Sequence, residues 1–125
     1  MGCLHPAWHD RHVVDDVMLV ARALVLRDLG ARGLDIAAAV DVLDAALTER
    51  RWWVEQWPDG AAFVAGQLAQ DVQDRLLDAK VGRWPSCETC VDEEAHELRI
   101  EPELGPDPQW VCEKTGRLAA PLGAL

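Results

Sequence analysis

Three stretches in the first 80 residues repeat apolar side chains at the three- and four-residue spacing of amphipathic helices. In the first stretch, from Val13 to Leu29, the apolar positions include 13, 17, 20 and 24, with 14, 18, 21 and 25 alongside. This spacing predicts a helix with a wide buried face. Gly30 and Gly33 follow and predict the end of this helix.

A second helix is expected from Asp35, acting as its N-cap, to about Gln56. Pro58-Asp59-Gly60 predicts a turn, in which Asp59 could cap a third helix. The third helix is expected to end at Gly82. The apolar stripes consist of Ile36, Val40, Leu43, Leu47 and Val54 in the second helix, and Val64, Leu68, Val72 and Leu76 in the third.

The pattern changes after Pro85 from helical spacing to short alternation. Leu98 and Ile100 alternate with charged residues, Trp110 and Cys112 alternate in a second segment, and 118–120 form a third. This alternation predicts short half-buried strands. The fold class is therefore mainly α, with a three-helix domain over 1–82 and a small β module over 83–125. A hairpin of this size buries too little surface to fold unaided and needs a staple or a partner.

The cysteines suggest what that staple is. Cys87 and Cys90 form a C-x2-C pair, and the next soft ligands along the chain are His96 and Cys112. Structural zinc takes four Cys or His ligands, typically with one tight C-x2-C pair. The spacing thus predicts a structural Zn²⁺ site that stabilises the module. A redox C-x2-C and unrelated cysteines are the alternatives. The redox role is disfavoured because no βαβ unit is present and Glu88 lies beside the thiols.

Residues 84–116 resemble a zinc ribbon, although the segment 112–116 offers one cysteine where the usual second knuckle carries two. His96 is the expected fourth ligand, since it is the only histidine in the module. The tail, with WVC at 110–112 and APLG at 120–123, is similar to small zinc-ribbon proteins of actinobacteria and their phages. That resemblance implies a component of a phage or phage-like particle as one form of the function.

A second group of soft ligands, Cys3, His5, His9 and His12, lies near the N-terminus. This group could form another metal site or lend the fourth ligand to the module. It is more typical of a chain start with histidines at a helix entrance. Because His9 and His12 are expected to precede the first helix, they would not share a helical face as catalytic zinc pairs do.

Tryptophan is concentrated at the end of the second helix. Trp53 and Trp57 are four residues apart on one expected helix face, whereas Trp52 lies off that face. Core packing is favoured for the group as a whole. Exposure of one or more of these rings as an anchor for a protein partner is the alternative.

The charge disfavours nucleic acid as the partner. The net charge is −10; residues 1–80 carry 8 basic and 13 acidic side chains, and residues 81–125 carry 4 and 9. Nucleic-acid binding draws on clusters of Lys and Arg, and the chain has none beyond Arg50-Arg51. The acidic balance mildly favours a basic protein surface.

No catalytic motif is recognisable, and the single serine, Ser86, lies beside the expected metal knuckle. No signal peptide or membrane span is predicted. We therefore expect a non-enzymatic structural or adaptor protein, cytoplasmic or in a virion, that docks on another protein or on a second copy of itself. A zinc-ribbon regulator that binds nucleic acid, and an acidic inhibitor that caps a basic partner in the manner of an antitoxin, are the alternatives.

Overall fold

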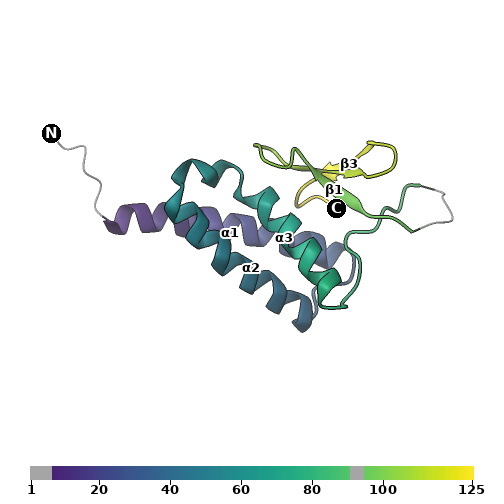
Figure 1. Ribbon diagram of the computed structural model, residues 1–125, viewed down its shortest axis with the longest axis horizontal. Helices are drawn as coiled ribbons and strands as arrows, with labels where there is room; N and C mark the ends of the chain where they lie inside the picture. The colour runs from purple at the N-terminus through teal and green to yellow at the C-terminus, as the bar shows by residue number, and fades with distance from the viewer. Residues whose placement is uncertain (1–6, 91–94) are drawn as a thin grey trace.

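Three helices are followed by a three-stranded antiparallel sheet (Figure 1). The computed structural model describes the backbone of residues 7–90 and 95–125, and the side chains of these ranges from residue 13 on. The fold class predicted from the sequence is confirmed, and the boundary at residue 82 stays a prediction. The elements are α1 (Ala7–Ala31), α2 (Ala37–Gln56), the 3-10 helix η1 (Pro58–Ala62), α3 (Val64–Asp78), β1 (Leu98–Glu101), β2 (Gln109–Cys112) and β3 (Leu118–Pro121).

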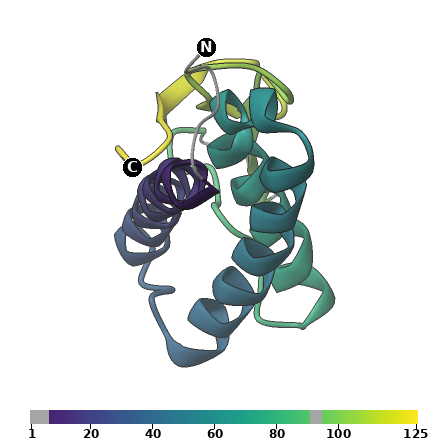
Figure 2. The same cartoon turned by 90° about the vertical axis from the view of Figure 1, so that its left-hand side faces the viewer.

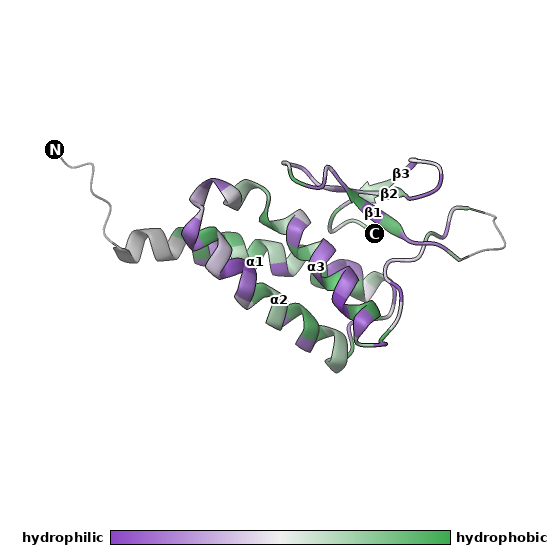
Figure 3. Cartoon of the chain, viewed as in Figure 1, coloured by the Kyte–Doolittle hydropathy of each residue, from purple (hydrophilic) through white to green (hydrophobic). Residues whose placement is uncertain are grey.

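The helices share one apolar core. Hydrophobic and hydrophilic segments alternate along α2 and α3, as amphipathic helices require (Figure 3). Burial of the apolar stripes is the main stabilising contribution to this part of the fold. The core side chains are Met18, Ala21, Val25 and Leu29 of α1, Ala39, Leu43, Ala46 and Val54 of α2, and Val64, Leu68, Ala69, Val72 and Leu76 of α3.

Arginine–carboxylate pairs link neighbouring helices at the edges of this core. Arg22 Nε lies 2.8 Å from Asp44 Oδ1 and joins α1 to α2. Arg50 makes a bidentate pair with Asp71, with Nε–Oδ2 and Nη2–Oδ1 distances of 2.5 and 2.9 Å, and joins α2 to α3. Arg51 pairs with Asp15 of α1. Partly exposed pairs of this kind contribute about 0.2–1 kcal/mol each, so they orient the helices more than they stabilise them.

The sheet lies over α1 and α3, and α2 lies on the far side of the helices (Figures 1 and 2). Glutamines on α3 donate to backbone carbonyls of the module: Gln73 Nε2 to Leu98 O at 2.6 Å, and Gln70 Nε2 to Glu103 O at 2.9 Å. The helix approaches closely at Gly66, where an added Cβ would lie 3.1 Å from Pro108 Cβ. The sheet is therefore fixed to α3 by hydrogen bonds to its backbone carbonyls and by the packing of its buried side chains Leu98, Ile100 and Trp110 in the shared core.

The helix ends differ in part from the sequence predictions. Helix α1 begins at Ala7, so the expectation that His9 and His12 precede it is wrong. The N-cap of α2 is Ile36, and no side chain caps that end; the Asp35 carboxylate lies instead beside Gly30. The predicted end of α2 at Gln56 is confirmed.

The region around α3 also departs from expectation. The predicted turn is a 3-10 helix, and Phe63 rather than Asp59 is the N-cap of α3. Helix α3 ends at Asp78, before Gly82, because Lys80 takes the left-handed conformation with φ of 59°. The N–H groups of Lys80 and Val81 then donate to the carbonyls of Leu77 and Leu76, which closes the helix as a Schellman motif.

The core prediction for the tryptophan group is wrong for Trp52 and Trp57, whereas Trp53 packs against the core. Trp52 is 63% exposed and Trp57 is 39% exposed, while Trp53 is half-buried. Trp53 and Trp57 pack edge to face with ring centroids 5.2 Å apart. They cover Gly60 of η1, where an added Cβ would lie 2.8 Å from Trp57. The cluster therefore joins α2 to η1 at the margin of the core.

Candidate metal centre and apolar groove

Backbone pairing beside β1 places the first cysteine next to the histidine. The N–H of Cys87 donates to His96 O, and the N–H of Leu98 donates to Pro85 O, both at 2.9 Å. Ser86 and Glu97 form the antiparallel bridge between these bonds. The residues flanking the bridge, Cys87 and His96, are therefore neighbours.

The register of the sheet brings in the last cysteine. Cys112 ends β2 and lies opposite Leu98 of β1, two residues after His96. The chain then turns: Gly116 N–H donates to Cys112 O at 2.8 Å, and Thr115 N–H lies 3.4 Å from Cys112 Sγ. The turn at 112–116 thus serves as a second knuckle with a single thiol.

Cys87, Cys90, His96 and Cys112 lie close together and can bind a metal ion. Their ligand atoms all lie within 4.8 Å of one another. Cys90 Sγ is 3.6 Å from Cys112 Sγ, and Cys112 Sγ is 3.3 Å from His96 Nε2. His96 and Cys112 are buried, and the C-x2-C pair is half-buried. The structure brings together all four residues singled out by spacing.

The three cysteines of the clustered site do not form a disulfide among themselves. A disulfide needs an S–S distance of about 2.05 Å, whereas Cys90 and Cys112 are 3.6 Å apart. Cys87, Cys90 and Cys112, the three cysteines in the described part of the chain, are all unpaired. Glu88 points away to Arg32 Nε at 3.4 Å, at the end of α1.

Local hydrogen bonds give the three thiols different pKa values. The hydroxyl and the backbone N–H of Thr115 lower the pKa of Cys112 to about 6. The hydrogen-bonded sulfurs of Cys112 and Cys87 raise the pKa of Cys90 to about 11. Burial raises the pKa of Cys87, but hydrogen bonds with Thr89 and Cys90 outweigh it, so that the net shift is downward. Three neighbouring thiolates repel one another, so their simultaneous deprotonation is unfavourable. A bound cation offsets this repulsion.

Sequence reasoning missed a buried polar cluster at the back of the module. Asp28 of α1 is fully buried, as are Trp84 and Trp110. The indole N–H of Trp110 donates to Asp28 Oδ2 at 2.8 Å, and that of Trp84 donates to the Asp28 carbonyl at 3.1 Å. The sequence contained a signal for this cluster. Asp28 follows positions 21 and 25 on the apolar stripe of α1, and an acidic residue buried there needs a hydrogen-bonding partner.

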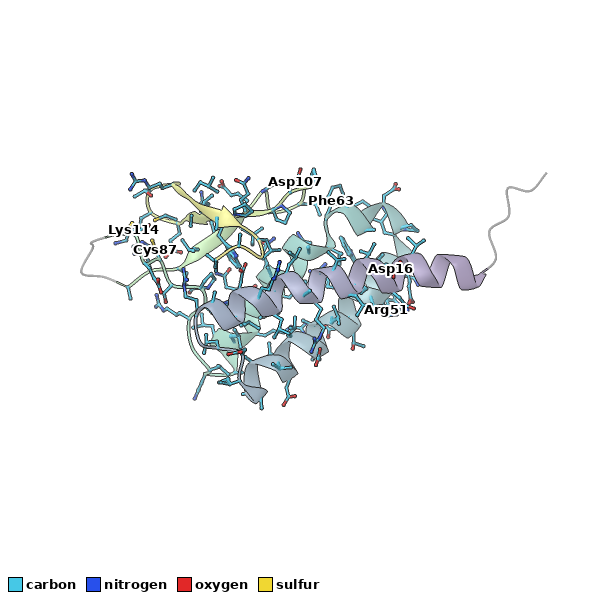
Figure 4. The ribbon with its side chains drawn as sticks, turned by 180° about the vertical axis from the view of Figure 1, so that it is seen from behind. Asp16, Arg51, Phe63, Cys87, Asp107 and Lys114 are labelled. Carbon is cyan, nitrogen blue, oxygen red and sulfur yellow. The ribbon has the colours of Figure 1, made fainter. Side chains whose placement is uncertain are left out.

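An apolar groove of about 300 Å³ lies between α1 and the start of α3. On α1, Val13 is 49% exposed and Val20 is 60% exposed, although the sequence predicted both on a buried face. Figure 4 shows Asp16, which lines the groove, toward the opposite end of the molecule from Cys87 and Lys114. The groove is lined by Asp16, Val17, Val20 and Ala21 of α1 and by Ala61, Val64 and Ala65.

The side chains of the N-terminal ligand group, Cys3, His5, His9 and His12, all lie outside the part of the chain that the structure describes. Cys3 and His5 lie outside the described residues. The backbone of His9 and His12 belongs to α1, but their side chains also lie outside the description. The hypothesis that this group lends a ligand therefore stays a prediction.

Among the described residues, no helix has the length and apolar character needed to cross a membrane. No curated protein and no solved structure matches the chain. One family model matches the chain, over residues 14–122. This range contains α1 from residue 14 on, all of α2 and α3, the four clustered ligands and the sheet. The description of the family model makes no mention of metal or of a zinc ribbon. The chain belongs to this family, the domain of unknown function DUF8819.

Proposed function

We propose that this protein is a non-enzymatic structural or adaptor protein that docks on another protein through the α1 groove, with a structural zinc ion in its C-terminal module. The observation that carries the docking proposal is the uncovered apolar face of α1. Val20 lines the groove and is 60% exposed, and Val13, one helical turn before the lining residue Val17, is 49% exposed. Contiguous exposed apolar surface rimmed by polar residues marks interaction sites.

The charge around the groove indicates the chemistry of the partner. Among the residues that line the groove Asp16 alone is charged, and Asp59 lies nearby in η1, whereas Asp15 is paired with Arg51 of α2. A segment with apolar side chains on one face and Lys or Arg beside them would complement both features. A second copy of this chain would instead bring the same acidic residues face to face. We therefore assign the groove to a basic, amphipathic segment of another protein.

The arrangement of the four ligands supports zinc. Tetrahedral zinc with bonds of about 2.3 Å to sulfur and 2.0 Å to nitrogen places sulfurs about 3.8 Å apart and sulfur and nitrogen about 3.5 Å apart. The Cys90 Sγ–Cys112 Sγ and Cys112 Sγ–His96 Nε2 separations of 3.6 and 3.3 Å are close to these values. Three Cys and one His complete a tetrahedral shell and leave no position for water, as in structural rather than catalytic sites.

The engagement of the arginines supports a protein partner over nucleic acid. Arg50 and Arg51, the one basic pair in the chain, contact Asp71 and Asp15 respectively. Arg22 contacts Asp44. These side chains are committed to carboxylates and do not form a phosphate-binding patch. Membership of a larger assembly, such as a phage or phage-like particle, is the form of the function that the resemblance implies.

The docking proposal is tested with three designed peptides of equal length, titrated by isothermal calorimetry at low and moderate salt. The first has a Leu face flanked by Lys, the second has the same composition scrambled, and the third replaces Lys with Glu. We expect binding of the first peptide only. Val20→Asp should weaken it at least about tenfold, because the substitution places a charge at the groove.

Leu19→Asp is the matched control, since Leu19 is 65% exposed on the same helix but does not line the groove. Equal loss of binding in both variants would overturn the assignment of the groove. Equal binding of the scrambled peptide, or salt-sensitive binding of random DNA, would overturn the proposed partner chemistry. A concentration-dependent dimer that Val20→Asp abolishes would show that the occupant is a second copy.

A further inference from the structure

The carboxylate of Asp28 is directed entirely to the C-terminal module. Trp110 Nε1 and Gly123 N donate to its Oδ2 at 2.8 and 2.6 Å, and Leu125 N donates to its Oδ1 at 3.0 Å. A buried carboxylate is costly unless such donors satisfy it. Asp28 also lies in the last turn of α1, where the helix dipole disfavours a negative charge. The docked module is therefore what makes a carboxylate tolerable at this position.

Both tryptophans in this cluster are close in sequence to metal ligands. Trp84 precedes Cys87 by three residues, and Trp110 precedes Cys112 by two residues in β2. Their rings are fully buried and meet edge to face, with centroids 5.2 Å apart. Because both indoles also donate to Asp28, the two segments that supply cysteines are fixed to a single residue of α1.

We propose that Asp28 is a positioning residue for the metal ligands. Its carboxylate binds the Trp110 indole, and the Trp110 ring packs against Trp84, so that the two cysteine-bearing segments stay in register. Metal binding and docking of the module on the helices then form one coupled event. This inference rests on the proposed zinc site. Coupling of this kind is reciprocal: if the docked arrangement tightens zinc binding, zinc must strengthen docking by the same factor.

The test is zinc affinity, measured by competition with a chromophoric chelator. Asp28→Asn replaces one acceptor oxygen with an NH2 group, which cannot accept the hydrogen bonds that converge on the carboxylate. We expect zinc affinity to fall about 10- to 100-fold, as for other residues that orient metal ligands. Asp41→Asn, on an exposed part of α2, should leave it unchanged. If Asp28→Asn does not fold, Trp110→Phe takes its place in the test. It keeps an aromatic ring but removes the N–H, and it should also lower the zinc affinity.

Two further measurements separate positioning from general stability. Leu43→Ala weakens the helical core without touching the cluster, so its zinc affinity should equal that of the wild type. Zinc should raise the melting temperature of the helical circular-dichroism signal in the wild type, and by less in Asp28→Asn.

Wild-type affinity in folded Asp28→Asn and Trp110→Phe would overturn the inference and leave the zinc site standing. Equal losses in Leu43→Ala and Asp28→Asn would also overturn it. Absence of zinc binding by the wild-type protein would overturn both the site and the inference.

Discussion

The three helices supply most side chains of the apolar core, from Met18 to Leu76, whereas the C-terminal module, with strands of only four residues each, adds a few side chains to the same core. The helices are cross-linked by partly exposed ion pairs at the core margin. The module instead combines four metal-ligating side chains with a buried carboxylate and two buried indoles. Area burial is the main contribution in the first region, while the small module depends more on directed polar interactions, to which a bound metal ion would add.

This difference suggests separate roles for the two candidate sites: the metal centre would stabilise the module, and the groove on α1 is available to a partner. The Asp28 cluster fixes the module to α1, and the proposed metal centre would strengthen it from within. The groove on α1 adds little to the stability of the helices, and it exposes the surface that a partner could cover. Substitutions in the two regions should therefore give different observable losses.

Cys112→Ser should produce the largest effect. It removes one of three thiolates from a site whose occupation by zinc is worth about 10–16 kcal/mol in comparable structural sites. We expect loss of the bound zinc and of amide-exchange protection in β1, β2 and β3, with the helical circular-dichroism signal retained. Cys3→Ser is the matched control and should keep its zinc. Zinc loss in Cys3→Ser would mean that the N-terminal group supplies a ligand, and stoichiometric zinc in Cys112→Ser would contradict the ligand set.

Leu43→Ala should destabilise the helices and leave the metal centre intact. Leu43 is fully buried at the centre of the helical core. Its truncation should lower the free energy of unfolding by about 2–5 kcal/mol. Urea denaturation followed by circular dichroism measures this loss, and metal analysis should still find one zinc per chain. A stability loss below that of an exposed-site control such as Leu19→Ala would show that the core is wrongly placed.

Gly60→Ala should have a smaller effect, confined to the junction of α2 and η1. The added methyl group would lie 2.8 Å from Trp57 and 3.0 Å from Trp53, and both rings must shift. Overpacking of this kind costs about 1–3 kcal/mol. Tryptophan fluorescence and denaturant midpoints would report it, with Gly30→Ala as the comparison, because a Cβ there would meet nothing closer than 3.6 Å. Unchanged stability in Gly60→Ala would place the Trp53–Trp57 cluster elsewhere.

The pair of Arg22 and Asp44 should contribute least. Its side chains are 32% and 50% exposed, so solvent screens most of the attraction across the 2.8 Å contact. A double-mutant cycle with Arg22→Gln and Asp44→Asn should give a coupling free energy of about 0.2–1 kcal/mol that decreases with salt. A larger, salt-independent value would mean that surface pairs, rather than the core, hold α1 to α2.

The sequence allowed the three helices, the three strands and the ligand cluster to be predicted, because each depends on a local period or a short spacing. The helix starts were less predictable, since Asp35 turns toward Gly30 and leaves the N-cap position to Ile36. The Asp28 cluster escaped prediction because Trp110, its main partner, is 82 residues away along the chain. The exposure of Val20 was missed for a related reason: periodicity identifies an apolar face, but only packing decides which part of that face a neighbouring element covers.

The ligand shell of the metal tests the central claim of this account most directly. X-ray absorption at the zinc edge, on protein purified without added zinc, measures the number and type of donor atoms around the ion. We predict one zinc per chain with three sulfurs at about 2.3 Å and one nitrogen at about 2.0 Å. Absence of zinc, or a shell that contains a water oxygen in place of one of these ligands, would contradict a closed structural site built from Cys87, Cys90, His96 and Cys112.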